Sequence, residues 1–286
     1  MSLNVKKIPV GAVGHPPPQN DILPIHEFSM GLIAPKGSGK TTLLANLVKF
    51  YSKYFHTILV FSPTVKSDEK WDWVKKQKVI EDNTPLKKWL KNKNEEEEEK
   101  TPSAVDRQSN PTNPEYAPLL DFTIPEGNFY EEYDEDTLQA IMDEQMDLIR
   151  ALKDAGKTKH LANRIMIIFD DLVGSSLFSN KKKNPFKILN TTHRHYSISM
   201  LMVTQAYKEI PKTVRTNFSA LILFEIPNEK ELEVIYEENP VGLSHDDWMK
   251  FYNYSTDGDH DFMFINYQKP KNQRITKNFT HILYKK

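Results

Sequence analysis

Nine consecutive residues carry the clearest chemistry in this chain. These nine residues are Ala34, Pro35, Lys36, Gly37, Ser38, Gly39, Lys40, Thr41 and Thr42, and an apolar stretch lies on each side of them. Gly37 and Gly39 allow a tight loop whose backbone N–H groups face inward, and the helix that follows adds its positive end. In such a loop Lys40 reaches the β and γ phosphates of a nucleotide, and the Thr41 hydroxyl ligates Mg²⁺. The run therefore predicts a site for ATP and magnesium, whereas a plain glycine-rich turn would leave the Gly-Lys-Thr-Thr order unexplained. Alanine at position 34, where such loops usually begin with glycine, is a small departure.

Two carboxylates follow an apolar run at residues 165–169, and they are Asp170 and Asp171. Ligands of open α/β folds bind at the carboxyl ends of the strands, where this pair is expected to lie. Asp170 then supplies a hard oxygen ligand for magnesium near Thr41, and Asp171 orients water or acts as the general base. The alternative for Asp171 is a helix cap or a solvated strand end.

A third apolar strand, at residues 198–203, ends in Thr204 and Gln205. An amide both donates and accepts hydrogen bonds, so Gln205 is suited to sense the terminal phosphate and hold the attacking water. A turn that caps the next helix is the competing explanation, above all for Thr204.

Strand and helix patterns alternate along the chain. Strand-like apolar runs occur at residues 57–61, 165–169, 198–203, 220–225 and 261–266, and a long amphipathic helix is expected at 134–155. This order predicts an α/β fold with a mostly parallel sheet and helices on both faces, as in P-loop NTPases of the RecA-like (ASCE) type.

The domain organisation is expected to be simple. Proline-rich residues 1–27 predict an extended arm, and residues 28–286 predict one P-loop ATPase domain. Residues 66–118 are charged and proline-rich, with an unbroken run at Glu95 to Glu99, and predict an acidic, partly disordered insertion. Trp71 and Trp73 within it are expected to cover an apolar surface from short helices.

Composition excludes several classes of protein. The chain has 286 residues, with 38 basic against 39 acidic side chains, so contact with nucleic acid must come from local patches. There is no cysteine, which excludes disulfides and thiolate metal sites and fits a reducing compartment. No apolar run is long enough to cross a bilayer, so a soluble intracellular protein without membrane contact is expected.

The motifs together resemble the FtsK-HerA superfamily of DNA-pumping ATPases, and within it the genome-packaging ATPases of poxviruses, giant viruses and virophages. The resemblance covers about residues 28–226, and residues 193–205 and 214–219 carry it besides the phosphate loop and the two aspartates. It implies that the strand before Gln205 lies between the strands that end at the phosphate loop and at Asp170. It also implies a homo-oligomeric ring, a pentamer or hexamer, acting on double-stranded DNA without reading its sequence.

In this family each ATP site receives an arginine from the neighbouring subunit. Arg194 is the first candidate for that role, and Arg215 is the reserve; an ordinary surface salt bridge is the alternative for both. Candidate DNA surfaces are the lysines at 181–183 and the basic C-terminal run that includes Lys277. Capsid proteins are further expected partners, and the expected location is the host cytoplasm or a viral factory, with association to the virion.

Three other functions remain open from the sequence. A GTPase-type switch would need an Asn-Lys-x-Asp motif, and the chain has none. A small-molecule kinase would need an arginine-bearing lid, yet the acidic insertion contains only Arg107. A capsid scaffold component that binds nucleotide merely to hold its fold is the third.

Overall fold

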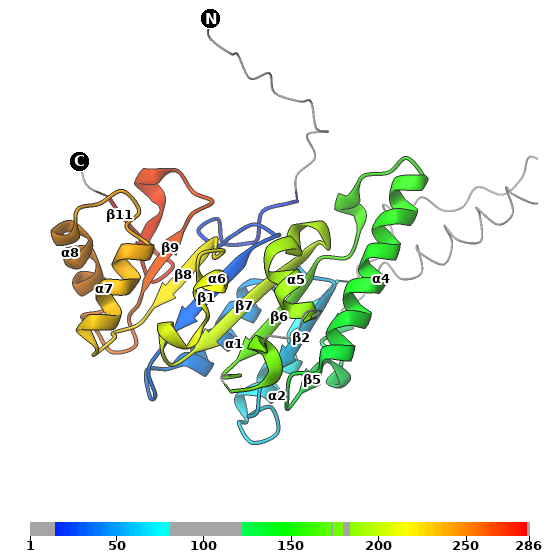
Figure 1. Cartoon of the computed structure of the whole chain (residues 1–286), viewed down its shortest axis with the longest axis horizontal. Coiled ribbons are helices and arrows are strands. Elements are labelled where there is room, and N and C mark those ends of the chain that lie inside the picture. Colours follow the sequence, from blue (N-terminus) through cyan, green and yellow to red (C-terminus); the bar gives the residue numbers. More distant parts are fainter. Residues whose placement is uncertain (1–14, 81–121, 173, 180–183, 285–286) are drawn as a thin grey trace, which may run out of the picture.

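The computed structural model describes residues 15–80, 122–172, 174–179 and 184–284. One nine-stranded sheet runs through it in the order β11-β10-β9-β8-β1-β7-β6-β2-β5 (Figure 1). Its strands are β1 (Ser29–Ile33), β2 (Thr57–Phe61), β5 (Phe129–Tyr130), β6 (Ile165–Asp170), β7 (Ile198–Thr204), β8 (Ala220–Leu223), β9 (Met263–Asn266), β10 (Ile275–Lys277) and β11 (His281–Leu283). The strands from β8 to β5 are parallel, and β9, β10 and β11 are antiparallel to their neighbours.

The predicted fold class is therefore confirmed, and the antiparallel end of the sheet is the one difference. The expected strand at 261–266 forms as β9, but it pairs antiparallel with β8. A short apolar run does not encode its own direction, which is set by how the chain returns to the sheet. The implied strand order is also confirmed, because β7 lies between β1 and β6.

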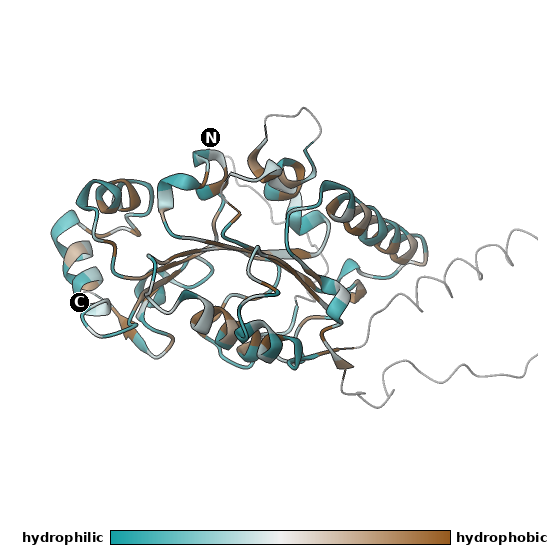
Figure 2. Cartoon of the chain, turned by 90° about the horizontal axis from the view of Figure 1, so that it is seen from below, coloured by the Kyte–Doolittle hydropathy of each residue, from teal (hydrophilic) through white to brown (hydrophobic). Residues whose placement is uncertain are grey.

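Helices cover both faces of the sheet, as Figure 2 shows. The helices are α1 (Lys40–Phe50), α2 (Lys70–Lys75), α4 (Glu135–Asp154), α5 (Pro185–Thr192), α6 (Lys212–Arg215), α7 (Glu229–Glu238) and α8 (His245–Ser255). Ile165, Ile167 and Phe169 of β6 share one apolar core with α4, α5, α7 and α8. Met166 and Ile168 share the other core with α1 and α2. The two-residue alternation of each strand thus supplies both layers, which explains why these strands are apolar throughout.

The remaining elements in the described part are short. β3 (Lys78–Val79) pairs antiparallel with β4 (Phe122–Thr123) beside the main sheet. Trp71 of α2 is fully buried and Trp73 is 39% exposed, so the helix expected near these tryptophans covers an apolar surface through Trp71. Residues 81–118 of the expected insertion lie outside the described residues, as do residues 1–14 of the expected arm. None of the helices in the described ranges combines the length and apolar character needed to cross a bilayer.

Candidate active site

The phosphate loop joins the end of β1 to the start of α1. Gly37 and Gly39 have φ angles of 85° and 95°, in the left-handed region that favours glycine. Gly39 occupies the N-cap position of α1 and makes no side-chain capping bond, so the first-turn N–H groups of α1 are left to bind an anion. Ala34 instead continues the sheet, with its N–H donated to the Thr204 carbonyl at 3.0 Å. Its φ is not positive, which explains why alanine is accepted there.

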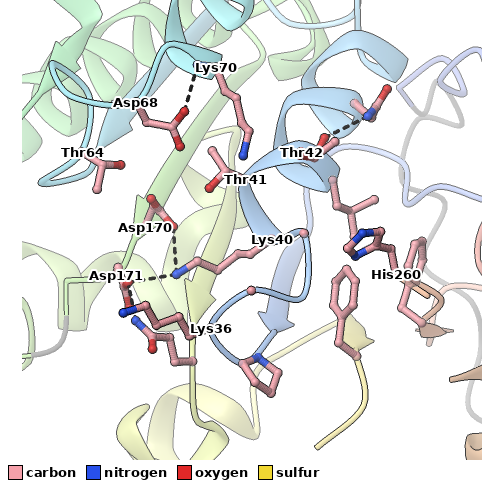
Figure 3. A pocket seen from close by; sticks show the side chains of 18 residues that line it. Lys36, Lys40, Thr41, Thr42, Thr64, Asp68, Lys70, Asp170, Asp171 and His260 are labelled. Atoms are coloured by element: carbon pink, nitrogen blue, oxygen red, sulfur yellow. Dashed lines mark hydrogen bonds and ion pairs between the residues drawn. The ribbon is translucent and has the colours of Figure 1, made fainter. Parts of the chain in front are cut away.

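The tips of β6 and β7 meet this loop. Lys40 Nζ lies 2.9 Å from Asp171 Oδ2 and 3.8 Å from Asp170 Oδ1. Gln205 Nε2 donates to the same Asp171 oxygen at 2.8 Å. Three segments that are far apart in the sequence therefore converge on one point, as Figure 3 shows for the labelled lysine and aspartates.

Asp170 has the burial and the free oxygen that a metal ligand needs. It is 3% exposed, and burial raises the pKa of its carboxyl above the ordinary value against the opposing effects of Lys40 and Ser62. Ser62 Oγ donates to Oδ2 at 2.7 Å, while Oδ1 is buried without a hydrogen-bond partner. Thr41 and Asp170 line the same cavity, and a hydroxyl and a carboxylate oxygen are the hard donors that Mg²⁺ prefers, so these two residues fit this ion.

The surroundings of Asp171 and Thr204 bear on the alternatives that the sequence left open, a helix cap for Asp171 and a turn for Thr204. Asp171 has a φ of 54°, and the next helical turn begins at Ser176 under a cap from Ser175, so Asp171 caps no helix. Thr204 Oγ1 donates to Glu209 Oε2 at 2.6 Å, within the turn that follows β7. Thr204 therefore serves the turn, and Gln205 is the residue of this strand tip that faces the site.

A cavity of about 840 Å³ surrounds these groups. All the predicted ligand-binding residues from Pro35 to Thr42 line it except Ser38, together with Asp170, Asp171 and Gln205. Sequence reasoning missed four residues that line the cavity (Figure 3). They are Thr64 and Asp68 in the loop after β2, Lys70 at the start of α2, and His260 in the loop before β9. The polar residues after the apolar run at 57–61 were a usable signal for the first group, since β2 is another parallel strand of the same sheet. Nothing local in the sequence marks His260.

Lys36 and Lys70 add positive charge to this cavity. Both side chains line it, and neither makes an ion pair with another residue in the described part of the chain. Cations that are not neutralised by protein carboxylates are suited to polyphosphate.

Arg194 lies away from its own cavity. It is exposed on a single 3-10 turn (His193–His195) just before β7, and the seven residues of β7 separate it from Gln205. At about 3.3 Å per residue this is on the order of 20 Å. Lys159 Nζ donates to the Arg194 backbone carbonyl at 2.8 Å and leaves the guanidinium uninvolved. The arginine therefore cannot serve the site of its own chain.

Arg215, the reserve candidate, is held inside the fold. Its side chain is 9% exposed, and it donates to Glu238 through Nε at 3.0 Å and Nη2 at 2.7 Å. Its guanidinium also lies 4.6 Å from the centre of the Tyr207 ring. Glu238 is 23 positions away in the sequence, so no local pattern could reveal this bidentate pair. Arg215 has a structural role, and Arg194 remains the candidate.

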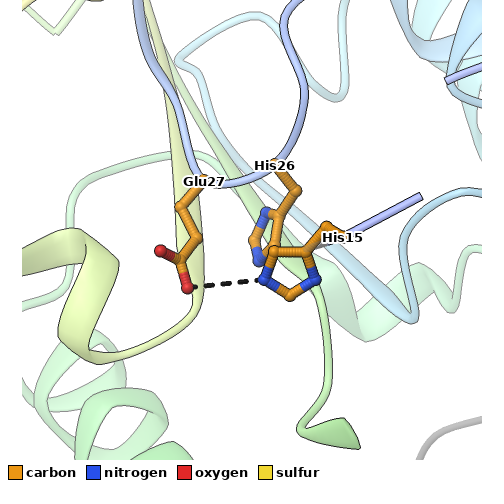
Figure 4. A group of neighbouring side chains, drawn as sticks. All are labelled: His15, His26 and Glu27. Atoms are coloured by element: carbon orange, nitrogen blue, oxygen red, sulfur yellow. Dashed lines mark ion pairs between the residues drawn. The ribbon is translucent and has the colours of Figure 1, made fainter. Parts of the chain in front are cut away.

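A cluster of titratable side chains holds residues 15–27 against the amino-terminal end of β7, and Figure 4 shows its three members. Side-chain atoms of His15, His26 and Glu27 lie within 4.8 Å of one another. Both ring nitrogens of His26 are taken by the hydroxyls of Ser199 at 2.7 Å and Ser197 at 3.0 Å. This stretch of the expected arm therefore packs on its own domain.

The other predicted features have mixed outcomes. Lys277 of the basic C-terminal run is bound by Asp257 and Asp261, so its charge is not free for DNA. Lys181, Lys182 and Lys183 lie outside the described residues.

The fold and the site define a P-loop ATPase. The sheet order, the left-handed glycines, the buried Asp170 and the facing Gln205 are each elements of that class. This confirms the enzyme class predicted from the motifs.

Residues 122–261, just under half of the chain, match the family model described as Poxvirus A32 protein, so this part of the chain is similar to that family. The match confirms the predicted kinship with ATPases of the poxvirus type. It includes Asp170, Asp171, Arg194, Gln205 and His260 and begins after the phosphate loop. Comparison with curated proteins gives no significant match.

Among solved structures, the chain is similar to the genome packaging NTPase B204 from Sulfolobus turreted icosahedral virus 2 in complex with AMP. The TM-score is 0.50 at 11% identity, over 87% of this chain and 95% of that one. The DNA-packaging ATPase B204 from Sulfolobus turreted icosahedral virus has a TM-score of 0.47 at 13% identity, over the same shares of the two chains. Because the identity is so low, the first likeness shows a common fold alone.

Proposed function

We propose that this protein is an ATP-driven translocase that packages a viral genome, as double-stranded DNA, into the capsid. One observation carries the proposal: Lys40 at the start of α1 and Gln205 after β7 both lie within 2.9 Å of the same oxygen of Asp171, which follows β6. The match to the Poxvirus A32 family supports the viral setting. The host cytoplasm or a viral factory, with association to the virion, is the corresponding location.

The reaction is phosphoryl transfer from ATP to water. Lys40 and the N–H groups at the start of α1 bind the phosphates and neutralise their charge. Asp171 accepts a proton from the attacking water, and Gln205, bonded to the same carboxylate oxygen, orients that water against the γ phosphate. Thr41 and Asp170 would hold a magnesium ion, which would supply charge neutralisation to the phosphates.

The subunits are proposed to form a closed ring. Arg194 is exposed just before the amino-terminal end of β7, whereas its own cavity lies at the carboxyl end of that strand, so its proposed role is in the site of another chain. Contact between two different surfaces of identical subunits is heterologous, and such contacts produce rings when the rotation closes. A guanidinium that enters a neighbour's site stabilises the transition state by about 10³- to 10⁵-fold in rate.

The test measures ATP hydrolysis with and without double-stranded DNA. The proposal expects stimulation by duplexes of unrelated sequence, because contacts to phosphates carry no sequence information. A hydrolysis rate indifferent to DNA, or transfer of phosphate to a metabolite, would argue against a translocase.

A mixing experiment tests the role of Arg194. Arg194→Ala is expected to lose hydrolysis and keep ATP binding, and so is Asp171→Asn. Mixing the two is expected to restore part of the activity, because some interfaces then combine an intact Asp171 with an intact Arg194. Arg150→Ala is the matched control, since Arg150 is an exposed arginine on α4 whose ion pair to Asp147 is 3.7 Å long. Absence of recovery on mixing would refute action between subunits.

A further inference from the structure

We infer that His260 reads the nucleobase of the bound nucleotide and makes the site prefer adenine to guanine. The inference rests on the proposed function and concerns the same site. His260 lies on the loop between α8 and β9 and lines the nucleotide cavity together with Phe224 and Phe262 (Figure 3).

The hydrogen bond of His260 to the phosphate loop determines its tautomer. His260 Nδ1 is 2.9 Å from the Ser38 carbonyl oxygen. A carbonyl oxygen only accepts, so Nδ1 carries the hydrogen and donates. In the neutral imidazole the other nitrogen, Nε2, is then an acceptor. An acceptor complements the exocyclic amino group of adenine, whereas guanine has a carbonyl oxygen at the same ring position.

The position of His260 is on the nucleoside side of the loop. β1 lies between β7 and β8, and Gln205 at the tip of β7 marks the end where the terminal phosphate lies. The nucleoside therefore leaves the loop toward β8 and β9, where Phe224 and His260 stand. A second hollow of about 440 Å³ borders the loop on this side, and both residues line it. The hollow and the hydrogen-bond acceptor Nε2 of His260 therefore lie on the side of the loop where the base is expected.

His260 is held in place by several independent contacts. Its φ of 65° is in the left-handed region, which is costly for a residue with a side chain and is found where the surroundings enforce it. The next residue, Asp261, accepts from Asn278 Nδ2 at 2.8 Å and pairs with Lys277 Nζ at 2.8 Å. On the other side, a Cβ atom at Gly39 would come within 3.1 Å of the His260 ring. The imidazole therefore lies against the phosphate loop in the absence of nucleotide, although its side chain is exposed.

The test compares ATP with two nucleotides that lack the 6-amino donor, which are GTP and purine riboside triphosphate. The variant is His260→Asn, because the asparagine amide reproduces the Nδ1 donor, lacks Nε2 and tolerates a left-handed backbone. Dissociation constants are measured on the full chain by competition, with inorganic tripolyphosphate as the probe of the phosphate site. His281→Asn, at an exposed histidine outside the cavity, is the matched control.

We expect the wild type to bind ATP about three- to tenfold more tightly than either analogue, the range of one neutral hydrogen bond. His260→Asn is expected to lose this preference with tripolyphosphate binding unchanged. Equal binding of ATP and purine riboside triphosphate by the wild type would overturn the inference without any variant. So would a variant that weakens tripolyphosphate as much as ATP, since His260 would then only support the loop. Stimulation of hydrolysis by DNA is a separate readout, so failure here leaves the proposed function intact.

Discussion

The hydroxyl of Ser62 offers the sharpest test of how the metal ligand is prepared. Ser62 is fully buried just after β2, and its hydroxyl donates a hydrogen bond of 2.7 Å to Asp170 Oδ2. Asp170 is 3% exposed, and its other oxygen has no hydrogen-bond partner among the described residues. Ser62→Ala therefore leaves a buried carboxylate with neither oxygen hydrogen-bonded, while Lys40 Nζ stays 3.8 Å away.

The size of the effect follows from the kind of bond that is lost. A hydrogen bond to a charged group contributes about 1.5–3 kcal/mol, and loss of a residue that orients a metal ligand commonly costs 10- to 100-fold in metal affinity. We expect the magnesium concentration for half-maximal hydrolysis to rise by about that factor. The Ser62 bond lowers the pKa of Asp170 against the effect of burial, so its removal raises that pKa further. Hydrolysis needs the ionised carboxylate, so the acid limb of its pH profile moves to higher pH.

The assay titrates magnesium at fixed ATP and repeats the titration across pH. Ser67→Ala is the matched control, because this exposed serine lies in the same loop and its hydroxyl only reaches the Thr64 carbonyl at 3.4 Å. Circular dichroism confirms that each variant is folded. If Ser62→Ala kept the magnesium dependence and the acid limb of the wild type, Asp170 would not be the prepared ligand that its surroundings indicate.

Two further predictions concern stability. Arg215→Met is expected to lower the free energy of unfolding by about 3–5 kcal/mol, since it leaves Glu238 without its nearly buried partner; a double-mutant cycle with Glu238→Gln in urea should show positive coupling, and additive effects would contradict the pair. Burial lowers the pKa of His193 to about 4, so the unfolded chain binds a proton first as pH falls. The free energy of unfolding should then drop between about pH 6.5 and 4, by no more than about 3 kcal/mol. His193→Leu should remove this part of the decline, which a difference curve against the wild type isolates from His26, and a curve unchanged by the substitution would be inconsistent with a buried neutral His193.

Much of the fold could be predicted because its strands are short, apolar and separated by helical patterns. The strand at 57–61 forms at those residues, and the helix expected at 134–155 forms as α4. The direction of β9 was not accessible, because an apolar run is compatible with either pairing. The contacts of residues 15–27 were missed as well, since a proline-rich composition says nothing about the pocket that receives His26.

The candidate site divides along similar lines. Asp170, Asp171 and Gln205 lie at or just after the ends of parallel strands, and Lys40 opens the helix after β1. Parallel strands bring their carboxyl ends to the same side of the sheet. The local motifs and the strand order therefore place these residues at the same site, where Lys40 and Gln205 both contact Asp171. His260 approaches the same point from a loop more than 200 positions away, with no motif of its own.

By itself, the amino-acid sequence determined what the phosphate loop is able to do. Glycines at 37 and 39 are needed for backbone angles that other residues resist, and Lys40 carries its charge wherever the loop lies. Only the tertiary structure decided which charges are free to act. The sequence does not distinguish Arg194 from Arg215, but Arg194 is exposed just before the start of β7 and Arg215 is bound to Glu238. The physical reason is that a charge's effect depends on its partners and its burial, and packing between distant segments sets both.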